Sequence, residues 1–128
     1  MDDQPIWMQT RSGPLLSMPY PIEVNDTRGV IWYHYSSGEL ADLIVDQFDE
    51  MLAQSDRLVC PISLHPFVMG RPYRLRQLRR ALEHIARERD RVWIARPRDI
   101  CAHVEGLPTG TVPGTENEGH CSRSRRAQ

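Results

Sequence analysis

The sequence predicts an α/β protein with a parallel sheet. Amphipathic helices are expected over residues 37–54 and 73–90, because apolar side chains recur there at helical spacing. Short apolar runs at 58–64 and 92–95 follow these helices, and each is typical of a buried strand. Since strands and helices alternate along the chain, the order favours βα units, whose strands run parallel.

The part of the chain ahead of the first helix predicts short strands and a turn. Residues 14–22 contain three prolines, which forbid a helix, but residues 15–18 can form one short strand. Residues 25–29 have the composition of a turn. The run 30–35 consists of β-branched and aromatic residues and predicts a strand. Six residues also fit a buried helix segment, so that alternative stays open.

The helix over 37–54 has a clear start and two distinct faces. Ser36 stands three residues before Glu39, which is the pattern of a capping box. The apolar stripe consists of Leu40, Ile44, Phe48 and Met51. The acidic side chains opposite are interpreted as a solvated face, because carboxylates need no partner there. A metal-binding cluster is the less favoured alternative.

The second half of the chain alternates in the same way and then changes character. Pro61 inside the apolar run 58–64 indicates an edge strand or a bulge. Pro97 suits the first turn of a short helix over 98–104. After Gly106 few apolar residues remain, too few to offset the entropy of ordering the chain. We therefore expect a domain over 1–107 and a disordered tail over 108–128.

Composition excludes several functions. The 128 residues carry 16 basic and 17 acidic side chains, and a net charge of −1 gives no general attraction to nucleic acid or membranes. Every basic residue is Arg, which excludes Schiff-base lysines and the phosphate-binding lysine of P-loops. No run approaches the roughly 18 apolar residues of a membrane span. The Arg-rich face of the helix 73–90 fits a solvated surface better than a phosphate-binding one. We expect neither a nucleic-acid nor a membrane partner.

The cysteines and the first residues favour a cytoplasmic location. Cys60, Cys101 and Cys121 are widely spaced and form no CxxC pair, so neither a disulfide framework nor a zinc knuckle is expected. Residues 1–13 begin with acidic side chains and contain no apolar core of a secretory signal. Both observations are typical of a protein in a reducing compartment.

His65 is the most informative single residue for function. It directly follows the apolar run 58–64 and precedes a loop rich in Gly and Pro. In parallel α/β folds, catalytic side chains project from the carboxyl ends of strands. A histidine there can serve as a general acid or base near neutral pH. The alternative is a loop histidine with a purely structural role. Asn25 and Asp26 follow an earlier strand and could line the same cleft, although turn chemistry explains them equally well.

The segment 62–67, Ile-Ser-Leu-His-Pro-Phe, resembles the last strand motif of the polysaccharide deacetylases, the NodB-homology group of carbohydrate esterase family 4. In that motif an apolar strand ends in Leu-x-His. Here Leu64 and His65 are adjacent, and Ile62 stands three residues before His65. The chain is most similar to the branch with cofactor-independent allantoinases and peptidoglycan-deacetylase-like proteins. Further similar segments are 2–7, 15–26, 41–51, 67–85 and 90–103, so the resemblance covers about residues 2–107.

This resemblance implies a distorted (β/α) barrel that hydrolyses a non-peptide C–N bond, typically an N-acetyl amide on a sugar. It implies that His65 is the general acid that protonates the leaving amine. It also implies that Asp3, Tyr20, Asn25 and Asp26 bind substrate in the cleft. Metal-dependent members hold a divalent ion, such as zinc, on an Asp–His–His set. That set is not found in these residues, so we assign no metal ligand here and expect zinc only in a longer parent protein.

We therefore expect residues 1–107 to form the C-terminal part of a barrel that is truncated at its N-terminal side. The parent's substrate would be a small-molecule or oligosaccharide amide. Without the metal ligands and the catalytic base, the chain alone is not expected to be a competent deacetylase. The alternative function is a non-catalytic interaction module, or barrel remnant, that completes its fold with another chain. Self-association through exposed barrel edges is one form of it.

Overall fold

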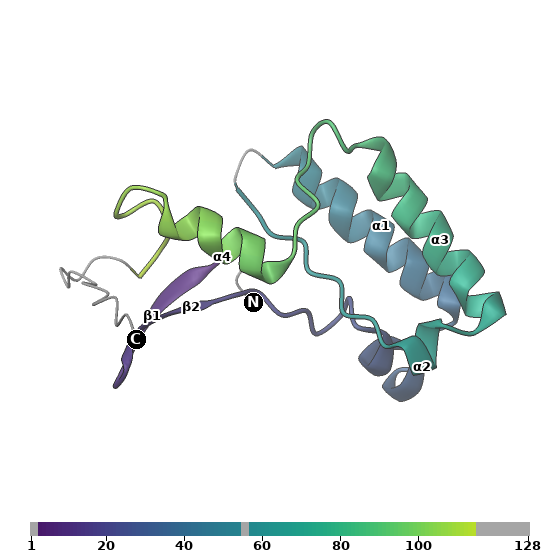
Figure 1. Cartoon of the computed structure of the whole chain (residues 1–128). Helices are drawn as coiled ribbons and strands as arrows, with labels where there is room; N and C mark the ends of the chain where they lie inside the picture. Colours follow the sequence, from purple (N-terminus) through teal and green to yellow (C-terminus); the bar gives the residue numbers. More distant parts are fainter. Residues whose placement is uncertain (1–2, 55–56, 115–128) are drawn as a thin grey trace, which may run out of the picture. The chain divides into compact units, whose positions relative to one another are not determined.

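The computed structural model describes residues 3–54 and 57–114 (Figure 1). The described residues form a mixed α/β structure with two strands and five helices. They divide into two compact units. One unit consists of residues 19–94 without the gap at 55–56, and the other consists of residues 3–18 and 95–114.

A β-hairpin begins the second of these units. Strand β1 (Ile6–Thr10) pairs antiparallel with β2 (Gly13–Ser17), with Trp7 opposite Leu16. The Thr10 hydroxyl donates a 2.6 Å hydrogen bond to the Gly13 carbonyl and closes the turn. Gly13 has a φ of 117°, a conformation that side-chain-bearing residues rarely adopt. The predicted strand over 15–18 thus lies largely within β2, whereas β1 was not predicted.

The same unit contains helix α4 (Pro97–Glu105), which confirms the predicted helix over 98–104. Pro97 occupies the first turn as expected, and the Arg96 amide donates to the Asp99 carboxylate at 3.3 Å. Of the predicted tail over 108–128, the structure describes residues 108–114. There Val112 is buried, and the Pro113 carbonyl accepts a 2.9 Å hydrogen bond from the Trp7 amide. Residues 115–128 lie outside the described residues.

Two long helices supply most of the core of the unit 19–94. Helix α1 (Ser37–Ala53) packs along α3 (Pro72–Arg87), as Figure 1 shows, which confirms the two predicted amphipathic helices. The buried apolar core consists of Val24, Val30, Leu40, Ala41, Ile44, Phe48, Val68, Met69, Leu78, Ala81 and Ile85. The predicted capping box is present. The Ser36 hydroxyl accepts from the Glu39 amide at 3.1 Å, and the Glu39 carboxylate accepts from the Ser36 amide at 2.7 Å.

The strand expected over 30–35 is wrong, because the chain forms the π-helix η1 (Thr27–Trp32) there. The Asn25 side-chain oxygen accepts from the Thr27 and Arg28 amides at 3.0 and 3.3 Å, which starts a helical turn. Val30 then packs into the core rather than into a sheet. Local capping and burial therefore outweigh the β-propensity of this run.

The apolar runs at 58–64 and 92–95 form no regular strand among the described residues. The first run makes one parallel bridge, between Ser63 and Asn25. Pro61 has no amide hydrogen to donate to a ladder, which limits pairing along this run. The bridge is the only parallel pairing that the structure contains in residues 3–54 and 57–114.

Helix α2 (Pro66–Met69) is a single turn that directly follows His65. Gly70 ends it, and a Cβ atom at this position would collide with the Pro66 carbonyl oxygen. In the part of the chain that the structure describes, every helix is too short or too polar to cross a lipid bilayer.

Candidate functional site

The parallel bridge brings two distant segments together at one end of the run 58–64. The Asp26 amide donates to the Ser63 carbonyl at 3.1 Å, and the Ser63 amide donates to the Val24 carbonyl at 3.0 Å. His65 follows two residues after the bridge, and its backbone enters α2 with Pro66 at the first helical position. The end of an extended run therefore places His65 beside the start of η1.

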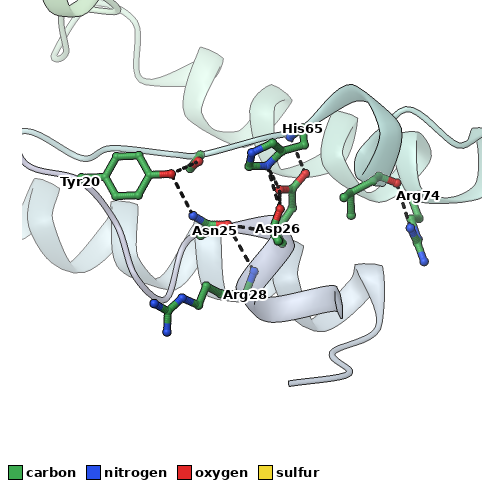
Figure 2. Close-up of polar contacts among 9 residues, drawn as sticks. Tyr20, Asn25, Asp26, Arg28, His65 and Arg74 are labelled. Atoms are coloured by element: carbon green, nitrogen blue, oxygen red, sulfur yellow. Dashed lines mark hydrogen bonds and ion pairs between the residues drawn. The ribbon is translucent and has the colours of Figure 1, made fainter. Parts of the chain in front are cut away.

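His65 and Asp26 form a doubly hydrogen-bonded pair (Figure 2). The His65 amide donates to Asp26 Oδ2 at 2.6 Å, and His65 Nδ1 lies 2.7 Å from Asp26 Oδ1. A carboxylate only accepts hydrogen bonds, so Nδ1 carries the hydrogen and donates it. This arrangement fixes both the tautomer and the orientation of the imidazole, and it leaves Nε2 as the nitrogen that can meet a substrate.

Burial differs sharply between the two partners. The Asp26 side chain is 0% exposed, whereas 38% of the His65 side chain is accessible. A buried carboxylate needs partners for its oxygens, and the His65 backbone and ring supply them. The pair therefore leaves part of the His65 side chain accessible to solvent and keeps its carboxylate partner buried.

Thr27 completes the polar contacts around Nδ1. Its hydroxyl oxygen lies 3.0 Å from His65 Nδ1, and the hydroxyl donates to Asp26 Oδ1 at 3.5 Å, the outer limit of a hydrogen bond. The Nδ1 hydrogen is thus shared between a carboxylate and a hydroxyl oxygen. Sequence reasoning missed Thr27, although its position directly after Asp26 was a usable signal.

A second polar chain runs from η1 to the edge of the site. The Asn25 amide nitrogen donates to the Tyr20 hydroxyl at 3.3 Å, and that hydroxyl lies 3.2 Å from the Ser63 hydroxyl. Asn25 is buried, while Tyr20 is 61% exposed. Asn25 therefore contacts both Tyr20 and the first turn of η1, and most of Tyr20 remains exposed to solvent.

Four of the five predicted site residues come together in this unit: Tyr20, Asn25, Asp26 and His65. Asp3 belongs to the other compact unit and is not part of this hydrogen-bonded group. Asp26 was expected to line a cleft and bind substrate, but its fully buried side chain contacts the imidazole instead. Its geometry fits a residue that orients His65.

The described residues do not supply a metal site. Among them no group of three or more His, Cys, Asp or Glu side chains is arranged to hold an ion. Asp26 and His65 are two potential ligands, but they are bonded to each other through the atoms described above. We therefore derive no chemical step through a metal from the residues present.

A second histidine–carboxylate pair has a different character. His84 Nε2 lies 2.7 Å from Asp49 Oδ1 and joins α3 to α1. The Asp49 side chain is 50% exposed, so water screens this pair and solvates its carboxylate. It is a surface contact between helices, and it provides a natural control for the buried pair.

Comparison with protein-family models, curated proteins and solved structures finds no match for this chain.

Proposed function

We propose that His65 and Asp26 form the general acid–base pair of a polysaccharide-deacetylase-like hydrolase that cleaves non-peptide C–N bonds in amides. The observation that carries the proposal is the 2.7 Å contact between His65 Nδ1 and a fully buried Asp26 oxygen. Such an arrangement holds the imidazole in the tautomer with hydrogen on Nδ1, and it stabilises the imidazolium when Nε2 is protonated. The resemblance of residues 62–67 to the deacetylase motif supports the same role for His65.

The pair can serve both halves of amide hydrolysis. With Nδ1 protonated, a neutral imidazole has a lone pair on Nε2 and can take a proton from the attacking water. The oxygen of that water then bonds to the carbonyl carbon. The protonated Nε2 next gives its proton to the amide nitrogen as the C–N bond breaks. Asp26 keeps its own charge throughout and balances the transient imidazolium.

The proposed fold is the C-terminal part of a distorted (β/α) barrel, in which the Asn25–Ser63 bridge lies between neighbouring parallel strands. We propose that further catalytic groups come from outside these 128 residues, with zinc among them in a metal-dependent parent. The parent's substrate would be an oligosaccharide or small-molecule amide in the cytoplasm. With the histidine pair alone, the chain should give only weak hydrolysis.

An activated substrate tests the role of His65 in the chain as it is. We expect the protein to accelerate hydrolysis of p-nitrophenyl acetate and, more weakly, of p-nitroacetanilide. The variant His65→Gln should lose this acceleration, because a general acid or base contributes about 10²–10⁴-fold. The matched control is His84→Gln, which removes an imidazole of the exposed pair and should keep the full rate.

Two results would contradict the proposal. Equal rates for the wild-type protein and His65→Gln would show that the imidazole is not catalytic. Equal losses in His65→Gln and His84→Gln would show only the ordinary reactivity of any surface imidazole. A further assay uses N-acetylated oligosaccharide and allantoin with and without Zn²⁺. Robust turnover there would overturn the proposal that further catalytic groups are needed.

A non-catalytic interaction module is the second candidate, and one observation favours it. The unit 19–94 exposes many large apolar side chains, more than isolated surface residues require. Those at least 60% exposed are Tyr20, Trp32, Phe67, Tyr73, Trp93 and Ile94. Sedimentation velocity at several concentrations tests this function. A concentration-dependent dimer together with no His65-dependent hydrolysis would favour the module over the hydrolase.

A further inference from the structure

Phe67 is an exposed aromatic ring directly beside the candidate catalytic histidine. Its side chain is 70% exposed, and its ring centroid lies 5.4 Å from that of His65, with the planes inclined at 57°. Phe67 is the second residue of α2, whose first residue, Pro66, restricts the backbone. The ring is thus held close to His65 without being covered by the core.

The exposure of Phe67 contrasts with that of its neighbours in α2. Val68 and Met69 are 0% and 2% exposed and anchor this turn in the core. Leaving a phenyl ring in water forgoes about 2 kcal/mol of burial, so the fold gains little from Phe67 itself. An apolar ring that the core does not use, next to a partly exposed imidazole, is suited to contact a ligand.

We propose that Phe67 is a specificity-determining residue that stacks against the ring of a cyclic amide-bearing substrate. The inference rests on the proposed function, because the scissile amide would have to face His65 while the substrate ring lies on Phe67. Aromatic rings offer a flat, weakly hydrated face to which the C–H face of a pyranose or a planar cyclic amide can bind. Acyclic amides have no such ring and gain nothing from this contact.

The polar side of the site fits the same ligand. The Tyr20 hydroxyl and the Ser63 hydroxyl lie 3.2 Å apart, and Ser63 is two residues before His65 along an extended segment. Residues two apart in an extended chain project to the same side, so these hydroxyls share a side with the imidazole. A ring that lies on Phe67 can therefore direct polar substituents toward hydroxyl partners.

Binding measured without turnover tests the inference. The full chain is titrated with each probe, and binding is detected by NMR. The ring-bearing probes are N-acetylglucosamine and hydantoin, and the acyclic probe is N-methylacetamide. Phe67→Ala should weaken binding of a ring-bearing probe about three- to ten-fold, the range of one aromatic contact, and leave N-methylacetamide unchanged. Phe67→Trp should restore the affinity. Comparison of the two ring-bearing probes distinguishes a pyranose from a planar ring.

The matched control is Tyr73→Ala. Tyr73 is 64% exposed, and its ring centroid lies 5.3 Å from the Arg74 guanidinium, so its removal deletes a ring of comparable exposure that packs on an arginine rather than on His65. It should not change the affinity. Equal binding by wild-type protein and Phe67→Ala would overturn the inference, as would equal losses in Phe67→Ala and Tyr73→Ala. A Phe67→Ala variant that changes only the sedimentation coefficient would identify an association surface and overturn it too.

The inference and the proposed function can fail separately. Phe67-dependent binding without His65-dependent hydrolysis would support the ring-binding site and contradict the hydrolase function. His65-dependent hydrolysis, together with binding of the ring-bearing probes that does not respond to Phe67→Ala, would support the hydrolase and overturn the ring site.

Discussion

Replacing Asp26 with Asn is the sharpest test of the histidine pair, because it keeps the size of the side chain and removes its charge. Asp26 accepts the His65 amide on Oδ2 and His65 Nδ1 on Oδ1. The Asn side chain in Asp26→Asn has one oxygen and one NH₂ group. Its oxygen can accept the hydrogen bond from the His65 backbone amide only if the NH₂ group faces His65 Nδ1. Nδ1 must then accept a hydrogen bond, and the hydrogen moves to Nε2.

The expected magnitudes differ for activity and stability. The neutral ring loses its basic Nε2, so the His65-dependent rate on p-nitrophenyl acetate should fall by about 100-fold or more. Two charge-assisted hydrogen bonds become neutral ones, a loss of about 1 kcal/mol each. Removing a buried charge lowers the desolvation cost by a similar or larger amount. We therefore expect the free energy of unfolding to change by no more than about 2 kcal/mol.

The tautomer is measured directly from the ¹⁵N chemical shifts of the His65 ring, alongside urea denaturation and the ester assay. Asp49→Asn removes the charge beside His84 in the exposed pair and should leave the His65 tautomer and the rate unchanged. The reasoning is refuted if Asp26→Asn keeps hydrogen on Nδ1 and retains the rate. It is also refuted if the variant loses the rate only because it unfolds.

Two further predictions concern the stability of the helical unit. Leu40→Ala removes a core side chain that is 0% exposed, and it should lower the free energy of unfolding by about 2–5 kcal/mol. The control Leu75→Ala removes a side chain that is 38% exposed and should lower it by less than about 1 kcal/mol. Urea denaturation measures both changes. Glu39 accepts hydrogen bonds from the backbone and side chain of Ser36, which hold its pKa below the ordinary 4.5. The stabilising contribution of the Glu39 carboxylate is therefore complete above about pH 5, and it is lost as pH falls through the lowered pKa. The urea midpoints of the wild-type protein and Glu39→Gln should therefore differ by a constant amount above about pH 5 and converge in acid. Parallel pH profiles would contradict this.

The helices could be predicted because their signals are local and repeated. Ser36 and Glu39 mark the start of α1, and apolar residues at helical spacing define its buried face. Pro97 marks the start of α4 in the same way. The strand expected over 30–35 is wrong because β-propensity is also a local signal, and residues 30–32 belong to η1, in line with the helical alternative. Capping by Asn25 and the burial of Val30 decide its conformation, and burial cannot be read from six residues.

The site could be predicted in part. His65, Asn25 and Asp26 were singled out because each stands near the end of an expected strand, and the bridge at Ser63 does bring them together. The direct contact between Asp26 and His65 was not predicted, because it depends on tertiary structure. Nor could the sequence show that Asp26 is buried while Tyr20 is exposed, since both are polar residues in a segment rich in turns.

The separation of the paired residues along the chain has a consequence for folding. The His65–Asp26 contact joins positions 39 residues apart, and the loop that it closes contains all of α1. Closing such a loop costs more chain entropy than the His65–Asp26 contact alone offsets. The packed helices must therefore hold the two ends of the loop in place. The environment of a single imidazole is therefore a reporter of long-range order in this unit. Its NMR signal should shift to that of a free histidine along with global unfolding, and fraying at the C-terminal end of α1 or α3 should leave it unchanged.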